Sequence, residues 1–149
     1  MSIQNSYSLL VRGPFETDLA EACAPRQCNV GLLAYSPLAF GQLTGKYIEN
    51  PKAHGRLTVF PPNWSPRYMR PRVIEATRRY MQIAKDHGMS ATELALAWCY
   101  TRNFVASTII GATTLEQLKI DIDAYQIKLS DEVVNAVNEV HFDFTNPGL

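Results

Sequence analysis

Short apolar segments alternate with helix-like segments along this chain, and this alternation restricts the possible folds more than any other feature. Apolar runs from Ile3 to Val11, Val30 to Ser36 and Val105 to Ile110 predict three short strands. The run "VGLLAYS" lacks any polar alternation, which is typical of a strand buried on both faces of a parallel sheet. Strands that alternate with helices predict parallel β–α units, so we expect an α/β fold.

Helical periodicity and capping residues predict the segments between the strands. One helix is expected from Phe15 to Arg26, and a second begins near Arg70 and Pro71 and ends at Gly88. "SATE" at 90–93 is a capping box that opens a very apolar helix. After the third strand, Thr113 or Thr114 with Glu116 caps a helix to about Ala124, and Ser130 caps the last helix.

The stretch from about 48 to 69 has no period and contains Pro51, Pro61, Pro62 and Pro66. A structureless loop of about twenty residues is uncommon inside a compact domain, and is usually either functional or disordered. Only three strands are visible along the 149 residues. Three parallel strands cannot close a barrel and leave two unpaired edges, so the chain predicts an incomplete sheet.

Composition excludes several classes of partner. Lys plus Arg and Asp plus Glu are both 14, so charge gives no reason to expect nucleic acid or a membrane surface. No apolar run approaches the roughly 20 residues of a membrane span, and the first residues do not resemble a signal peptide. Three cysteines without metal-ligand spacing favour reduced thiols in a cytoplasmic protein over a zinc or disulfide site.

Polar segments follow the three predicted strands, at the ends where α/β folds bind ligands. Tyr35 ends the second strand and could stack on a flat heterocycle, or it could be a core tyrosine. Gly41 and Gly45 allow a close approach of the backbone to an anion. The segment is not a P-loop, because the glycine spacing is wrong and because Lys46 is not followed by Ser or Thr.

Other residues near these ends admit two interpretations each. Lys46 and Arg56 could bind phosphates or could be solvated surface cations. Gly111 with the following threonines could bind an anion at a helix N-terminus, or the hydroxyls could be simple N-caps. Gln4 could bind a carboxamide. Taken together, the three strand ends indicate a site for a phosphorylated ligand with a flat ring, and the histidines show no metal spacing.

Four segments resemble the C-terminal part of an aldo-keto reductase. They are "IQNSYSLLVR", "LLAYSPLAFGQLTGKY", "ELALAWCYTRNFVASTIIGATTLEQLKIDI" and "LSDEVV", in the order expected for the family. The branch they resemble is that of the bacterial Tas-like reductases and the potassium-channel β subunits. The resemblance implies a (β/α)8 TIM barrel of which residues 1–149 would be the C-terminal portion, with strands six to eight and an extra C-terminal helix. It also implies carbonyl reduction with NADPH.

The resemblance assigns cofactor roles to twelve residues. Gln4 would contact the nicotinamide carboxamide, and Tyr35 would stack on the nicotinamide ring. The remaining positions would bind the pyrophosphate, close over the dinucleotide, or surround the adenosine phosphate and adenine: Ser36, Pro37, Leu38, Gly41, Lys46, Arg56, Gly111, Thr113, Gln117 and Asp121.

The sequence also departs from the family pattern. Asp121 stands where an adenine-contacting asparagine is usual, and Ile120 replaces a position that is often polar. Gln117 stands where many members have arginine, which leaves NAD open as well as NADP. No residue matches the family's catalytic Asp, Tyr, Lys or His, so acid catalysis has no donor among the matched residues.

Three functional hypotheses follow. The chain is part of an NAD(P)H-dependent oxidoreductase acting on a small-molecule carbonyl substrate, or a non-catalytic nucleotide-binding or regulatory protein, or a remnant that folds by oligomerising. Unpaired sheet edges predict either homo-oligomers or association with the missing barrel half. The 48–69 loop is expected to be mobile without cofactor, since a closing loop has low local stability.

Overall fold

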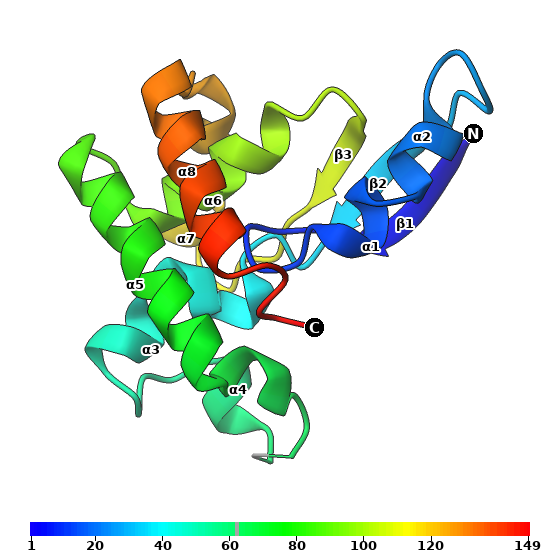
Figure 1. The fold of residues 1–149 in the computed structure, drawn as a ribbon. Helices are drawn as coiled ribbons and strands as arrows, with labels where there is room; N and C mark the ends of the chain where they lie inside the picture. Colours follow the sequence, from blue (N-terminus) through cyan, green and yellow to red (C-terminus); the bar gives the residue numbers. More distant parts are fainter. Residues whose placement is uncertain (62) are drawn as a thin grey trace.

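The computed structural model describes residues 1–61 and 63–149, and Pro62 of the predicted loop lies outside the described residues. Three strands, β1 (Ser2–Ser6), β2 (Gly31–Tyr35) and β3 (Val105–Ile109), form one parallel sheet in the order β1-β2-β3. Helices pack beside the sheet as Figure 1 shows. The predicted α/β fold with three parallel strands is therefore confirmed, whereas their numbering within a barrel stays a prediction.

Two short helices connect β1 to β2, and the longer connection from β2 to β3 ends with two longer helices. The first connection holds α1 (Gly13–Glu16) and α2 (Leu19–Cys23). The second holds α5 (Pro71–Asp86) and α6 (Ala91–Tyr100). After β3 come α7 (Leu115–Asp123), the 3₁₀ turn η3 (Ala124–Gln126) and α8 (Asp131–Asp143).

The predicted caps are present. Ser90 Oγ accepts from the backbone N–H of Glu93, and the Glu93 carboxylate accepts from the N–H of Ser90, which is the complete capping box. Thr114, not Thr113, is the N-cap of α7, and Ser130 caps α8. Gly88 follows α5 with a φ of 70°, a left-handed conformation that glycine adopts readily.

Four local predictions were wrong. β1 ends at Ser6 and not at Val11, because the chain then turns back on itself through the antiparallel bridge between Ser8 and Val11. The helix predicted to run unbroken to Arg26 is split in two between Glu16 and Leu19. The second strand is not buried on both faces as expected, because Leu33 and Tyr35 are only half-buried.

The fourth correction concerns the long loop, because its described residues are not structureless. They include the end of α3 (Lys46–Glu49), then α4 (Arg56–Val59) and the 3₁₀ turn η2 (Pro66–Met69). The sequence signal for such short elements is weak, since a single turn carries no apolar periodicity.

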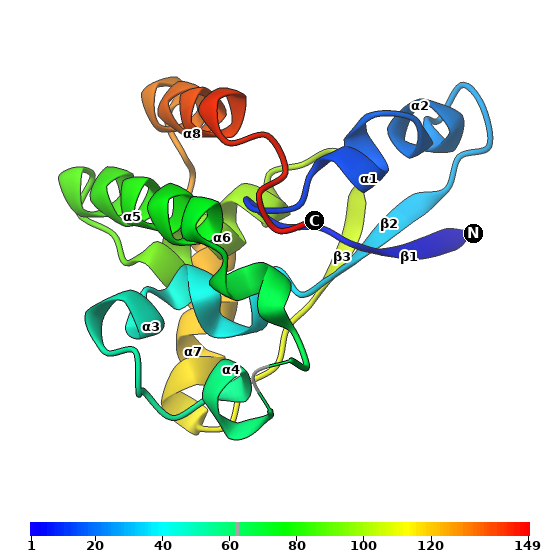
Figure 2. The ribbon, with the colours of Figure 1, turned by 60° about the horizontal axis from the view of Figure 1, so that its bottom comes forward.

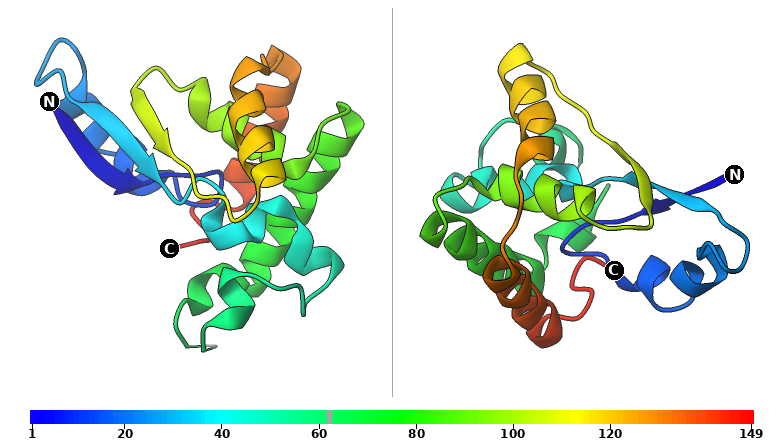
Figure 3. Two further views of the ribbon diagram at one scale, coloured as in Figure 1. Left: turned by 180° about the vertical axis from the view of Figure 1, so that it is seen from behind. Right: turned by 90° about the horizontal axis from the view of Figure 1, so that it is seen from above.

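The two faces of the sheet differ in what covers them. Leu32 and Ala34 of β2 are buried on the face that carries the core, where α1 and α2 also lie (Figures 2 and 3). On the opposite face Gln4 and Ser107 are exposed, and each is paired with Leu33 across the sheet. Since side chains alternate along a strand, Tyr35 shares this open face with Leu33.

The main core lies between the sheet, α5, α6 and α8. Trp98 of α6 is fully buried and stacks on Tyr7 at a centroid distance of 5.1 Å. Val133, Val137 and Val140 present one apolar stripe of α8 to this core. No helix among the described residues is both long and apolar enough to cross a bilayer.

Candidate functional site

The C-terminal ends of the three strands meet at one edge of the sheet. Tyr35 is paired in register with Ser6 of β1 on one side and with Ile109 of β3 on the other. The segments that the sequence marked as ligand-binding therefore begin side by side. Gln4 is a diagonal neighbour of Tyr35 on the open face, so the structure brings these two predicted contacts together.

The segment after β2 has an unusual backbone. Ser36 has a φ of 57° and Phe40 a φ of 59°, both in the left-handed region that non-glycine residues rarely occupy. Gly41 (φ 89°) and Gly45 (φ 83°) lie in the 3₁₀ segment η1 (Ala39–Thr44) and at its end. Strained residues of this kind persist only where the surroundings fix them, and they cluster at ligand sites.

The rest of this segment is held by local contacts. Pro37 is buried and Leu38 is half-buried beneath it. The backbone carbonyl of Leu38 accepts from the N–H groups of Gly41 and Leu43, at 2.9 and 3.2 Å. The Thr44 hydroxyl donates to the carbonyl of Gly41 at 2.8 Å. The loop is therefore ordered by its own hydrogen bonds, which leaves its shape ready for a ligand.

Both predicted phosphate-binding cations contact the protein. Lys46 Nζ donates to the backbone carbonyl of His54 at 3.2 Å and lies 5.0 Å from the ring centroid of Tyr47. The Arg56 guanidinium lies 5.2 Å from the ring centroid of Phe40. Neither cation forms an ion pair with a carboxylate among the described residues. Their charge thus remains uncompensated beside the loop.

The end of β3 leads into a hollow at the N-terminus of α7. A cavity of about 330 Å³ is lined by Thr113 and Gly111 together with Ile110, Ala112, Thr114, Leu115 and Leu118. Gly111 has open space where a side chain would begin. The Gln117 side-chain oxygen accepts from both the N–H and the hydroxyl of Thr113, at 2.9 and 3.0 Å. A ligand phosphate at this helix end would have to displace Gln117.

Asp121 does not join the other predicted residues. It is buried, with 2% of its surface exposed, on the side of α7 that faces α6, and it does not line the cavity. Its Oδ2 has no hydrogen-bond partner among the described residues. Burial raises the pKa of this carboxyl group.

Sequence reasoning missed two hydroxyl groups at the strand ends. Ser6 Oγ and Tyr68 Oη are buried without a well-formed hydrogen bond among the described residues. Burial is the largest influence on the pKa of the Tyr68 hydroxyl and raises it, while the Arg67 charge and, to a smaller extent, the Ser6 hydroxyl act in the opposite direction. Tyr68 carried no signal in the sequence, because it is a single aromatic residue in a segment without periodicity.

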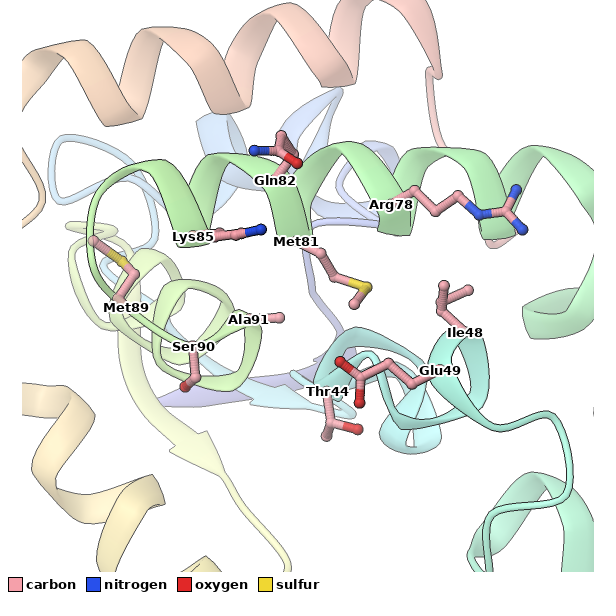
Figure 4. A pocket seen from close by; sticks show the side chains of 10 residues that line it. All are labelled: Thr44, Ile48, Glu49, Arg78, Met81, Gln82, Lys85, Met89, Ser90 and Ala91. Carbon is pink, nitrogen blue, oxygen red and sulfur yellow. The ribbon is translucent and has the colours of Figure 1, made fainter.

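A second cavity, of about 610 Å³, lies away from the strand ends. Figure 4 shows it between α5, the turn before α6, and α3, with Met81 and Ile48 as its apolar lining and Lys85 and Glu49 at its edge. The residues predicted to bind a ligand do not line it. Among the described residues no group of acidic, histidine and cysteine side chains could hold a metal ion.

Comparison with known proteins identifies the family of the chain. Residues 1–141 match the family model described as "Aldo/keto reductase family". The chain belongs to the aldo/keto reductase family. Members are oxidoreductases and generally use NADH or NADPH, so the flat-ringed, phosphorylated ligand inferred from the strand ends is of the kind that this family binds.

Individual aldo/keto reductases and their relatives extend the comparison. Protein tas of Escherichia coli K12 is 43% identical over 148 residues, which is 99% of this chain and 41% of that protein. An aldo-keto reductase of Babesia bovis is 36% identical, covering 98% of this chain and 53% of that protein. A candidate voltage-gated potassium channel subunit beta of Schizosaccharomyces pombe is 31% identical, covering 92% of this chain and 41% of that protein. This aldo/keto reductase chain thus spans about half the length of these relatives, or less, and its similarity to Tas and the channel subunit supports the predicted branch.

Proposed function

We propose that this chain binds the nicotinamide dinucleotide of an aldo-keto reductase, with NADPH as the first choice and NADH as the alternative. The observation that supports the proposal is the register of Ser6, Tyr35 and Ile109, because the three segments predicted to bind the ligand begin at these neighbouring strand ends. When bound, the dinucleotide supplies a hydride to a carbonyl carbon. The protein supplies binding and orientation.

The residues at the strand ends suit the nicotinamide portion. Tyr35 is half-buried at the end of β2, so one part of its ring is held while another part is accessible for stacking. The exposed Gln4 amide offers a donor and an acceptor, which match those of a carboxamide. The unsatisfied hydroxyl of Ser6 adds a polar group next to Tyr35.

The phosphate portion suits the loop after β2 and the start of α7. The φ of 89° at Gly41 is a conformation that side chains disfavour, and the absence of a side chain there lets the Lys46 side chain lie against the loop, with its Cε 3.2 Å and its Nζ 3.6 Å from where a Cβ atom would be. Lys46 and Arg56 have no carboxylate partners among the described residues and are available to neutralise phosphates. Thr113 becomes a donor to phosphate once Gln117 releases it.

Carbonyl reduction also needs a proton donor, and the sequence resemblance assigns the family's catalytic acid to no residue of this chain. We therefore infer that the chain contributes the cofactor part of a carbonyl-reducing site, in association with a partner that completes the barrel. The open face of the sheet around Gln4 and Ser107 supports such a partner. For the chain alone we expect cofactor binding without turnover.

An NADPH fluorescence titration of the purified chain, repeated with NADH, tests the proposal. Saturable binding should be weakened about two- to tenfold by Tyr35→Ala and preserved by Tyr35→Phe, because a stacked ring pair contributes about 0.5–1.5 kcal/mol. Phe142→Ala, at an exposed position on α8, is the matched control. Absence of binding by a folded chain, shown by its circular dichroism, would contradict the proposal.

The similarity to a candidate channel subunit favours a second function, that of a nucleotide-binding regulatory protein. Both functions require binding of the dinucleotide, so the titration does not separate them. Reconstitution does. A complex with the remaining part of the barrel that binds NADPH tightly but does not reduce carbonyl compounds would favour the regulatory function.

A further inference from the structure

The cavity of about 610 Å³ between α5, α3 and the turn that leads into α6 has no role in the proposed function (Figure 4). None of the residues assigned to the cofactor lines it. Its volume falls within the roughly 300–1,000 Å³ that is typical of small-molecule sites. The cavity is therefore large enough for a ligand other than the dinucleotide.

The middle of this cavity is apolar. Met81 projects from α5 toward Ile48 of α3, and Met89 adds a second thioether where the turn enters α6 (Figure 4). All three side chains are only partly buried, so part of each remains accessible to a ligand. Methionine side chains are flexible and polarisable, which suits them to bind apolar groups of different shapes. Met81 also packs on Gly45, with its Cε 2.7 Å from where a Cβ atom would be, so the cavity adjoins the loop after β2.

Most polar side chains at the cavity are already engaged with the protein. Arg78 pairs with Glu75, with 3.4 Å between nitrogen and oxygen, and the Gln82 amide donates to Asp86 at 2.6 Å. The threonine and serine hydroxyls at the cavity are held in the loop after β2 and in the capping box of α6. These groups therefore have little capacity left to bind a ligand.

Two charged side chains at the cavity, Lys85 and Glu49, are not engaged in this way. Neither forms an ion pair with any described residue, and they do not pair with each other. Figure 4 shows the Lys85 ammonium group on the α5 side and the Glu49 carboxylate on the α3 side, with Met81 projecting between the two elements. Opposite charges on two walls, with apolar surface between them, match a ligand that carries an anionic group, a cationic group and an apolar side chain.

We propose that this cavity binds a small zwitterion with an apolar side chain, of the kind represented by an apolar amino acid or dipeptide. The carboxylate of the ligand pairs with Lys85, and its ammonium group pairs with Glu49. Its apolar side chain lies against Met81 and Ile48. This site is separate from the proposed cofactor site, and binding to it requires no dinucleotide.

NMR of the methionine methyl groups tests both the binding and its location. Of the four methionines in the chain, Met81 and Met89 line the cavity, whereas Met1 and Met69 do not. Without dinucleotide, L-leucine should shift the signals of Met81 and Met89 saturably and leave those of Met1 and Met69 unchanged. The substitutions Met81→Leu and Met89→Leu assign the two signals. A parallel titration with L-leucyl-L-leucine, whose charged groups are farther apart, shows which length of zwitterion fits better.

Blocked forms of the tighter probe test the role of each charge. Acetylation of its amine removes the ammonium group, and amidation removes the carboxylate. Each change should weaken binding about two- to fivefold, the range expected for an exposed ion pair. Glycine, which has both charges but no apolar side chain, should cause no saturable shift.

Variants assign each charge of the ligand to one residue. Lys85→Gln should weaken binding of the zwitterion, and amidation of the probe should then have no further effect. Glu49→Gln should also weaken it, and acetylation should then have no further effect. Lys128→Gln and Glu139→Gln, at exposed positions that do not line the cavity, are matched controls and should bind as the unaltered chain does.

Three results would overturn the proposal. The first is the absence of saturable shifts at Met81 and Met89 with either probe up to its solubility limit. The second is an equal shift of all four methionine signals, which would indicate unspecific binding. The third is an affinity that neither acetylation nor amidation changes, because the cavity would then bind apolar groups without recognising the charges.

Discussion

Gly31 of β2 and Ala106 of β3 approach each other so closely that a Cβ atom on Gly31 would lie 2.6 Å from the Cβ of Ala106. The pairing of β2 with β3 is irregular just beyond this point, between Leu32 and Leu33. The absence of a side chain at Gly31 thus allows the two strands to remain together where their register shifts.

We predict that Gly31→Ala destabilises the chain by about 1–3 kcal/mol, because neither Cβ atom can move without displacing its strand. The additional substitution Ala106→Gly should restore much of the loss by removing the opposing methyl group. Urea unfolding of the two single variants and the double variant measures this coupling. Gly111→Ala, where a Cβ meets nothing within 4 Å, is the control. Additive effects of the two changes would contradict the proposed contact.

A partly buried ion pair between Arg12 and Glu16 predicts loss of stability in acid. Burial alone would raise the pKa of the Glu16 carboxyl, but hydrogen bonds from Arg12, with Nε 3.0 Å from both oxygens, and from Tyr7 outweigh it and hold the pKa below its usual value. A carboxyl whose pKa is lower in the folded state contributes stability above its unfolded pKa. This contribution is lost as the pH falls through the folded value.

We therefore expect the free energy of unfolding to decrease below a pH of about 4.5, the unperturbed pKa of this carboxyl. Glu16→Gln should lower stability at neutral pH by about 1.5–3 kcal/mol and flatten the acid dependence. Urea midpoints between pH 3 and 7 measure both effects, with the exposed Glu21→Gln as control. An unchanged acid slope in Glu16→Gln would count against this pair as its source.

Asp121 predicts the opposite pH dependence. Burial raises the pKa of its carboxyl, so the stability associated with the protonated form is lost as the pH rises through the folded value. Asp121→Asn should stabilise the chain at neutral pH by about 1 kcal/mol, because it removes a buried charge without a partner. The gain should shrink in acid, and thermal melts at pH 4 and pH 7 would show it. A variant less stable at neutral pH would exclude this explanation.

Self-association is expected from the unpaired edges of the sheet. Neither β1 ("SIQNS") nor β3 ("VASTI") carries a charge or a proline that would discourage pairing with another strand. Ile109 of β3 is also exposed, as are Leu115 and Ile122 of α7. Light scattering should show assemblies larger than one chain. Ile109→Lys should reduce them, and Thr17→Lys, at an exposed position between α1 and α2, should not. A monodisperse monomer of the unaltered chain would refute the expectation.

The elements predicted best from the sequence are the long helices with a clear apolar periodicity. The helices α5, α6 and α8 were located from apolar stripes and from capping residues such as Ser90 and Ser130, because one strip of each helix must be buried and its first N–H groups must find acceptors. The β2 strand was located because a short, continuous apolar run that ends at Tyr35 is typical of a strand and of few other elements. These signals depend on residues that are near one another in the sequence, and tertiary packing does not change the elements that they predict.

The errors arose where packing between distant segments decides the structure. The apolar residues Tyr7 to Val11 were interpreted as a strand, yet they are buried in a turn, where Gly148 donates its N–H to the carbonyl of Leu10. A partner 138 residues away leaves no trace in local periodicity. For the same reason the contact of Arg56 with Phe40 and the position of Tyr68 beside Ser6 could not be predicted.

The spatial order β1-β2-β3 repeats the order of the strands along the chain. In such a sheet each new β–α unit is appended at an edge and none has to be threaded between strands already in place. Genes encoding sheets of this kind can therefore lengthen, shorten or recombine at the connections between units while the interior pairs stay intact. A crossover within residues 24–30 or 101–104 would exchange whole units, which makes these two connections the natural places to build chimaeras with the longer relatives.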